Sequence, residues 1–168
     1  VPLPMMTRLA LSALCPPALA VALALGLLPS SAHAQRAGAK ALLLEKSDDW
    51  AAYAAQNGKD KICYAMTQPK DRQPGGLNRD PAYFYIWQEP TKNVRNEISL
   101  ILGYPSKNGG DASATIGAAT FQFATKDTNA FLKNPAETSR FLDAMRKGEK
   151  LVFKGTSARG NTLTDTYS

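Results

Sequence analysis

After its first forty residues, the chain is a succession of short apolar segments separated by residues that favour turns. Asn57-Gly58 and the Pro- and Gly-rich stretch 69–81 are typical of such turns. Segments of this length with turn signals between them predict β-strands. We expect strands at 41–46, 61–66, 82–88, 96–103, 113–117, 120–125, 151–154 and 162–168. The pattern predicts an all-β domain, either a β-sandwich or a barrel-like sheet.

One expected strand, with the sequence AYFYIWQ, is strongly aromatic. In an extended chain Tyr83, Tyr85 and Trp87 lie on one face, and Phe84 and Ile86 lie on the other. Apolar groups on both faces favour a central strand that is covered on both sides. A packed sheet interior is therefore our preferred interpretation of the two tyrosines and the tryptophan. The alternative is an aromatic platform for sugars or for a partner protein.

The segment 135–147 predicts one α-helix inserted among the strands. Asn134 can cap the N-terminus, Pro135 suits the first turn, and Glu137 completes a capping box. Gly148 can adopt the left-handed conformation that ends many helices. The apolar residues at helical spacing are Phe141, Leu142 and Met145.

The sequence ends in LVFKGTSARGNTLTDTYS, in which glycines, hydroxyl groups, an arginine and a carboxylate occur together. A nucleophile elbow requires G-x-S-x-G, but Arg159 occupies the position of the last glycine. A phosphate-binding P-loop requires a lysine where Asn161 stands. We therefore interpret the passage as a β-hairpin that turns at 158–161.

The N-terminus predicts a secretory signal peptide over residues 1–34. A basic start precedes the apolar run Leu9–Leu28, and Ala32-His33-Ala34 is a typical cleavage site. An uncleaved membrane anchor is the competing interpretation, because roughly 20 apolar residues can span a bilayer. Pro16-Pro17 interrupts the run and favours a cleaved signal. Residues 35–168 would then form the mature β domain.

Cleavage would remove the only histidine of the chain, His33. Ser-His-Asp and Cys-His mechanisms need an imidazole, and most zinc, copper and iron sites need imidazole or several thiolates. We therefore expect no enzymatic activity, no cofactor and no metal. Cys63 would be the one remaining cysteine, in an oxidising compartment. It could pair with another chain, stay free, or pair with a residue beyond Ser168.

Five stretches in this order resemble the invasion associated locus B (IalB) family of exported bacterial proteins. They are KICYAMTQPK, DPAYFYIW, NEISLILGYPSK, ATIG and DAMRKGEKLVFKGTSARGNTLTDTYS. The resemblance covers roughly Trp50–Ser168, and the block from Lys154 onward is its most specific part.

The resemblance implies a secreted or envelope-associated β-sandwich protein, in a family some of whose members are linked to host-cell entry. It implies no catalytic residues, because none are established for the family. Similar proteins continue with a further strand, a helix and a cysteine that would match Cys63. The resemblance therefore implies that this chain lacks its C-terminal strand, helix and closing cysteine.

Seven residues are candidates for an interaction surface: Tyr83, Tyr85, Trp87, Arg146, Lys147, Lys154 and Arg159. The basic members could attract anionic lipopolysaccharide, host glycans or a membrane surface, although an ordinary solvated face is the simpler interpretation. No nucleic-acid recognition motif is present, so we expect no nucleic-acid partner.

Two functions remain open. The first is a non-catalytic periplasmic, outer-membrane-associated or secreted protein that contacts a host or envelope component. The second is a small periplasmic, histidine-independent enzyme that acts on glycans or other envelope material. Such an enzyme needs a cavity with two carboxylates roughly 5–10 Å apart. Asp48 and Asp49 are poor candidates, because adjacent residues of an extended chain point in opposite directions.

The signal-peptide interpretation predicts that the exported protein begins at Gln35. Intact-mass measurement and N-terminal sequencing of protein recovered from a bacterial expression host test this directly. A protein that keeps residues 1–34 would contradict the prediction and favour the membrane anchor.

Overall fold

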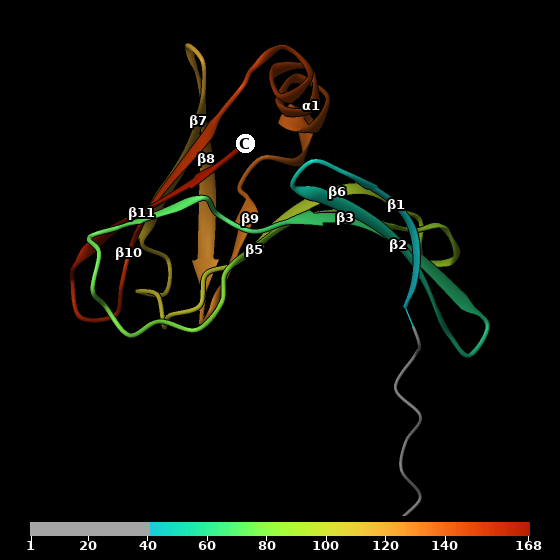
Figure 1. Cartoon of the computed structure of the whole chain (residues 1–168), viewed down its shortest axis with the longest axis horizontal. Coiled ribbons are helices and arrows are strands. Elements are labelled where there is room, and N and C mark those ends of the chain that lie inside the picture. Colours follow the sequence, from blue (N-terminus) through green and yellow to red (C-terminus); the bar gives the residue numbers. More distant parts are fainter. Residues whose placement is uncertain (1–40) are drawn as a thin grey trace, which may run out of the picture. The chain divides into compact units, whose positions relative to one another are not determined.

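Residues 41–168 are described by the computed structural model, and they form one antiparallel sheet of eleven strands with one α-helix (Figure 1). The predicted signal peptide lies outside the described residues. The strands follow one another in the sheet in the order β1-β2-β3-β5-β6-β9-β8-β7-β10-β11-β4. Their bounds are β1 Leu42–Ser47, β2 Trp50–Asn57, β3 Asp60–Thr67, β4 Asp71–Gln73, β5 Tyr83–Glu89, β6 Val94–Ile101, β7 Asp111–Ile116, β8 Ala119–Lys126, β9 Asn129–Leu132, β10 Leu151–Thr156 and β11 Thr162–Tyr167. The all-β prediction is confirmed.

Three strands were not expected from the sequence: β2, β4 and β9. The sequence of β2 is WAAYAAQN, and alanine has a low strand preference. Its pairing with β3 is fixed by the turn at Gly58, whose φ of 63° lies in the left-handed region that glycine tolerates. The turn places Tyr53 directly opposite Tyr64.

The chain passes almost directly from β3 into β4, which lies at the far end of the strand order. Strand β3 pairs with β2 and β5, whereas β4 pairs with β11. The sheet therefore curls until β4, at one end of the strand order, lies close to β3, the third strand from the other end. As a result Phe84 on β5 contacts Tyr167 on β11, with ring centroids 5.7 Å apart.

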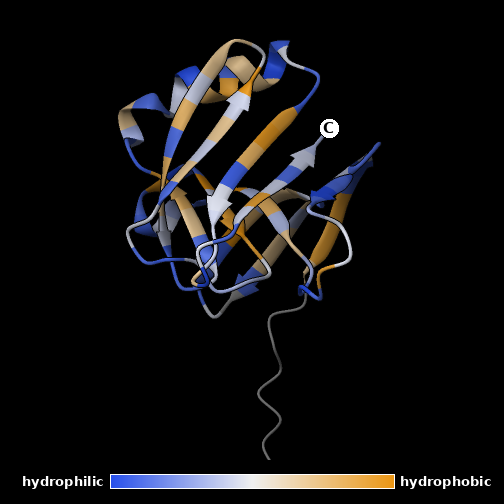
Figure 2. Ribbon diagram, turned by 90° about the vertical axis from the view of Figure 1, so that its left-hand side faces the viewer, coloured by the Kyte–Doolittle hydropathy of each residue, from blue (hydrophilic) through white to orange (hydrophobic). Residues whose placement is uncertain are grey.

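The core lies inside this curl and is built largely from aromatic rings. Phe84, Phe121 and Phe141 are fully buried, and Phe123 and Phe153 are nearly so. Along β8 the buried and exposed residues alternate, as expected for a strand with one solvent-facing side. Figure 2 shows this alternation of hydrophobic and hydrophilic residues in several strands.

The helix α1 comprises Thr138–Lys147 and follows a short 3-10 turn, η2, at Pro135–Glu137. Asn134 caps that turn, because its Oδ1 accepts a hydrogen bond from the Ala136 amide at 3.1 Å. Among residues 41–168 no helix has the length and apolarity needed to cross a bilayer.

Two details of the predicted helix boundaries are wrong. Glu137 makes no capping hydrogen bond and instead forms an ion pair with Arg140. Gly148 is extended, with φ −97°, and not left-handed. A glycine is needed there for lack of space, since a Cβ atom would lie 2.4 Å from Cγ2 of Ile116.

Phe141 anchors α1 to the sheet and should dominate the stability of this contact. Its ring lies 4.7 Å from that of Phe121 and 6.0 Å from that of Phe84. We expect Phe141→Ala to lower the free energy of unfolding by about 3–5 kcal/mol, measured by urea denaturation. The matched control is Phe131→Ala, which removes a ring that is 38% exposed and should cost less than about 1.5 kcal/mol. Equal losses for the two variants would contradict this packing.

Candidate functional site

One face of the sheet carries aromatic side chains that do not reach the core. We call it the outer aromatic face and define it as Tyr53, Tyr64, Tyr83, Tyr85 and Trp87. Tyr53 lies opposite Tyr64, and Tyr64 lies opposite Trp87, in adjacent strands β2, β3 and β5. Side chains that are directly opposite in an antiparallel pair project from the same side of the sheet.

The rings of this face contact one another across the strands. The centroids of Tyr53 and Tyr64 are 5.2 Å apart in a stacked pair, and those of Tyr64 and Tyr85 are 6.0 Å apart at 60°. Tyr83 and Tyr85 are also neighbours, at 6.0 Å. Only Tyr53 and Tyr64 stack face to face, whereas the contacts of Tyr85 with Tyr64 and with Tyr83 are edge-on or tilted. The result is a half-buried aromatic surface made of residue types that are enriched at protein interfaces.

The hydroxyl groups of Tyr64 and Tyr85 are protonated at neutral pH. Burial raises the pKa of Tyr64 and of Tyr85, and the neighbouring tyrosines raise both further. A neutral tyrosine hydroxyl both donates and accepts hydrogen bonds.

The position of these residues corrects the expectation that β5 is covered on both sides. Strand β5 is central in the sheet, between β3 and β6. Only the Phe84 side reaches the core, where the ring of Phe141 from α1 stacks on Phe84. Tyr83, Tyr85 and Trp87 are half-buried on the opposite side.

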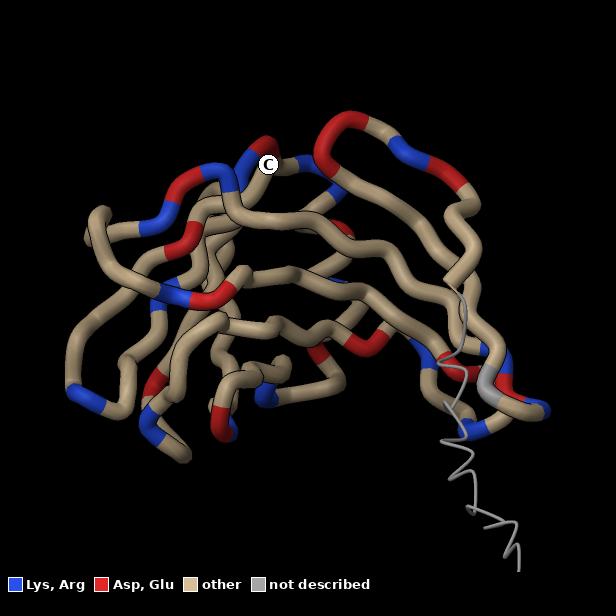
Figure 3. Tube along the Cα trace, turned by 60° about the horizontal axis from the view of Figure 1, so that its bottom comes forward, with Lys and Arg blue, Asp and Glu red and all other residues tan. Residues whose placement is uncertain are grey.

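The four basic candidates do not gather into one patch. Arg146 and Lys147 end α1, just before β10 begins, and Arg159 follows the far end of β10. Six strand residues span about 20 Å, so these groups lie at opposite ends of that strand, with Lys154 exposed between them. Arg146 is paired with Asp143 at 2.7 Å. Figure 3 shows basic and acidic residues interspersed over the described part of the chain.

Cys63 lies in β3 on the side opposite the outer aromatic face. It is half-buried, forms no disulfide among residues 41–168, and has Ala54 and Gln88 as its cross-strand neighbours. A shallow hollow of about 220 Å³ opens beside it. The disulfide expected from the resemblance remains a prediction.

A buried ion cluster holds the C-terminal hairpin to the rest of the sheet. Asp165 on β11 is 2% exposed and accepts hydrogen bonds from Arg72 Nε at 3.0 Å and Nη2 at 3.2 Å. Arg79 Nη1 lies 3.5 Å from the same carboxylate. Arg72 also donates to the carbonyl oxygens of Asp80 and Leu102, each at 2.8 Å. Because these hydrogen bonds occupy Arg72 and Asp165 within the protein, we assign the cluster a structural role.

A cavity of about 530 Å³ lies beside this cluster and is bordered by segments 77–80, 103–105 and 157–163. Burial, followed by the charge of Asp165, raises the pKa of Tyr104 in its wall to about 12. The only acidic residue in the lining is Asp80. The lining therefore does not supply the two converging carboxylates that glycoside hydrolysis uses.

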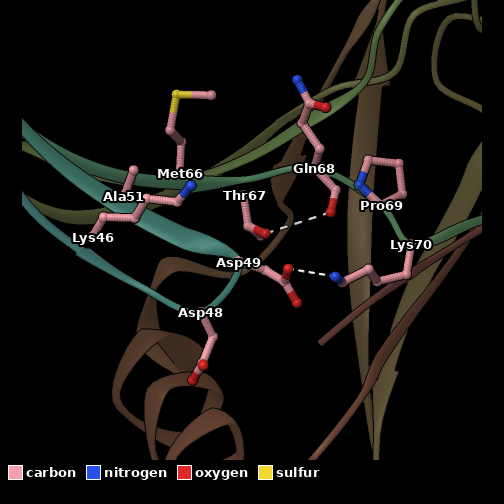
Figure 4. A pocket seen from close by; sticks show the side chains of 9 residues that line it. All are labelled: Lys46, Asp48, Asp49, Ala51, Met66, Thr67, Gln68, Pro69 and Lys70. Carbon is pink, nitrogen blue, oxygen red and sulfur yellow. Dashed lines mark hydrogen bonds and ion pairs between the residues drawn. The ribbon is translucent and has the colours of Figure 1, made fainter.

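Asp48 and Asp49 border a second cavity, of about 350 Å³ (Figure 4). Their side chains point in different directions in this view. Hydrogen bonds from the Lys70 ammonium and the Ser168 hydroxyl lower the pKa of Asp49, so that it is a carboxylate and not an acid at neutral pH. The sequence argument assumed an extended chain here, whereas both aspartates lie in the turn between β1 and β2, where Asp48 has a φ of 50°.

Sequence reasoning missed Tyr53 and Tyr64 as members of the outer aromatic face. The turn signal at Asn57-Gly58 was present, but the chain turns one residue later, at Gly58-Lys59, and only this register sets the two tyrosines opposite each other. Residues 41–168 contain no group of three or more His, Cys, Asp or Glu side chains that could hold a metal ion.

No family model matches the chain, and the searches of curated proteins and of solved structures find no match either. The fold and the described surface define an all-β protein whose most distinctive feature is an aromatic sheet face directed away from the core.

The ion cluster generates a stability prediction. Asp165→Asn leaves the largely buried side chains of Arg72 and Arg79, 20% and 7% exposed, without their carboxylate, so we expect a loss of about 3–5 kcal/mol in the free energy of unfolding. In the control, Asp143→Asn breaks an exposed ion pair and should change stability by less than about 0.5 kcal/mol. The free energies of unfolding of both variants are measured by chemical denaturation. A loss below about 1 kcal/mol for Asp165→Asn would contradict a stabilising role of the ion cluster.

Proposed function

We propose that this chain is a non-catalytic interaction module that is exported and acts at the cell envelope or at the surface of a host cell. The observation that carries the proposal is the outer aromatic face. An antiparallel sheet with one solvated side normally presents polar residues there. Here four tyrosines and a tryptophan occupy it, and tyrosine and tryptophan are the residue types enriched at the centres of protein interfaces.

The energetics of the face support contact with a partner. Covering half-buried rings removes apolar surface from water at little cost in side-chain entropy, since the rings already restrain one another. The protonated hydroxyl groups can then supply directional hydrogen bonds.

Export is supported by the sequence of residues 1–34, and an envelope or host-contact role by the resemblance to the IalB family. The β-sandwich architecture of that family and its disulfide at the position of Cys63 belong to the same proposal. The outer aromatic face gives such a protein a surface on which to bind.

The experiment compares strains of the producing bacterium that lack the gene and carry it back in altered forms. One form combines Tyr64→Ser with Tyr85→Ser, and the matched control combines Lys154→Ser with Arg159→Ser. Adhesion to host cells and resistance to envelope stress are measured, with circular dichroism of each purified protein to check folding.

We expect the aromatic variant to behave like the deletion and the basic variant to behave like the wild type. Two interface tyrosines should together contribute at least about a tenfold change in affinity. Loss of adhesion or of stress resistance in the basic variant alone would indicate that the cationic residues, and not the outer aromatic face, form the binding surface. Unchanged adhesion and stress resistance in the deletion strain, or turnover of envelope glycans by the purified protein, would contradict the proposal.

A further inference from the structure

Strand β1 forms one edge of the sheet, and its only neighbour among the described strands is β2. All six of its residues are exposed. The other edge, β4, has only three residues, is followed by Pro74, and is held by the buried contacts of Arg72. Proteins usually protect sheet edges by shortening them, by charges or by proline. Strand β4 has these protections, whereas β1 has a β-bulge after Leu43 and charges in its second half but neither a charge nor a proline in its first half.

The unprotected half of β1 consists of three leucines. Leu42, Leu43 and Leu44 are 66%, 51% and 57% exposed, whereas Leu100 inside the sheet is 1% exposed. A run of leucines on an exposed edge combines free backbone hydrogen-bonding groups with apolar side chains. Both favour the addition of another strand.

We propose that β1 pairs with β1 of a second copy of this chain, antiparallel and around a two-fold axis at Leu43. Two-fold pairing of identical strands places the central residue opposite its own counterpart. With Leu43 at the centre, Leu42 lies opposite Leu44 of the other copy, and all six leucines meet. Pairing centred on Glu45 or Lys46 would instead set like charges directly opposite each other, which is unfavourable.

This self-complementarity is the reason that a second copy fits β1 as its occupant. The β-bulge between Leu43 and Glu45 limits the regular ladder to a few residues, so the dimer is weak and depends on concentration.

Pairing would also extend the outer aromatic face. Leu43 lies opposite Tyr53, in the same cross-strand row as Tyr64 and Trp87. In the dimer the two rows, one from each copy, meet at the paired leucines. The dimer then presents two outer aromatic faces to one partner surface, and this avidity strengthens attachment. This consequence rests on the proposed function, whereas the pairing itself does not.

The test is sedimentation velocity across about a hundredfold range of concentration, using the chain expressed with its own N-terminal segment and purified from the compartment where it accumulates. The wild type should shift from monomer to dimer. Leu43→Lys and Leu43→Glu place like charges opposite each other and should each weaken dimerisation by at least about tenfold. Mixing these two variants should restore a heterodimer. The control is Leu77→Lys, which charges a leucine of similar exposure (48%) in a loop and should dimerise like the wild type.

A wild type that stays monomeric, or a dimer that both charged variants retain, would overturn the inference. Failure of the mixed variants to pair would overturn the register at Leu43. Hydrogen–deuterium exchange on the wild type provides a measurement independent of any substitution. The amides of β1 should exchange more slowly at high than at low concentration, and exchange that does not depend on concentration would count against pairing.

Discussion

Arg72 makes the contact on which the shape of the sheet depends. From β4 its guanidinium group binds the buried carboxylate of Asp165 on β11 and the carbonyl oxygens of Asp80 and Leu102. It thereby connects the last strand of the chain to the segments that precede β5 and follow β6. With β4 and β11 held against these segments, Phe84, Phe121, Phe123 and Phe153 are directed into the interior of the curled sheet. The phenylalanine core fills that space.

The same closure explains why an aromatic strand has two different faces. Once Phe84 is directed into the core, the alternation along β5 leaves Tyr83, Tyr85 and Trp87 on the outside. Because α1 covers the inner side through Phe141, the rings on the outer side can only pack on one another. The protein thus has a surface whose rings contact one another and which is mostly uncharged and partly exposed. These are the properties of a binding surface formed before its partner arrives.

Local features of the sequence were enough to predict the strands that have alternating patterns and the hairpins that have glycine turns. The turn at Gly58, the strands β7 and β8, and the hairpin β10–β11 are examples. The sequence could not predict the curl of the sheet, because Arg72 and Asp165 are 93 residues apart. Without the curl, the covered side of β5 could not be distinguished from the outer one. The extended conformation of Gly148 was missed for a related reason, since it depends on Ile116 of a distant strand.

The central claim is that the outer aromatic face is covered by a partner where the protein works. Hydroxyl-radical footprinting of the protein in intact producing cells and after purification measures this most directly. Tyr64, Tyr85 and Trp87 should be modified in the purified protein and protected in the cells. Tyr104 and Tyr167, which are 6% and 1% exposed, should stay unreactive in both states. Equal modification of the outer aromatic face in the cells and in solution would contradict the claim.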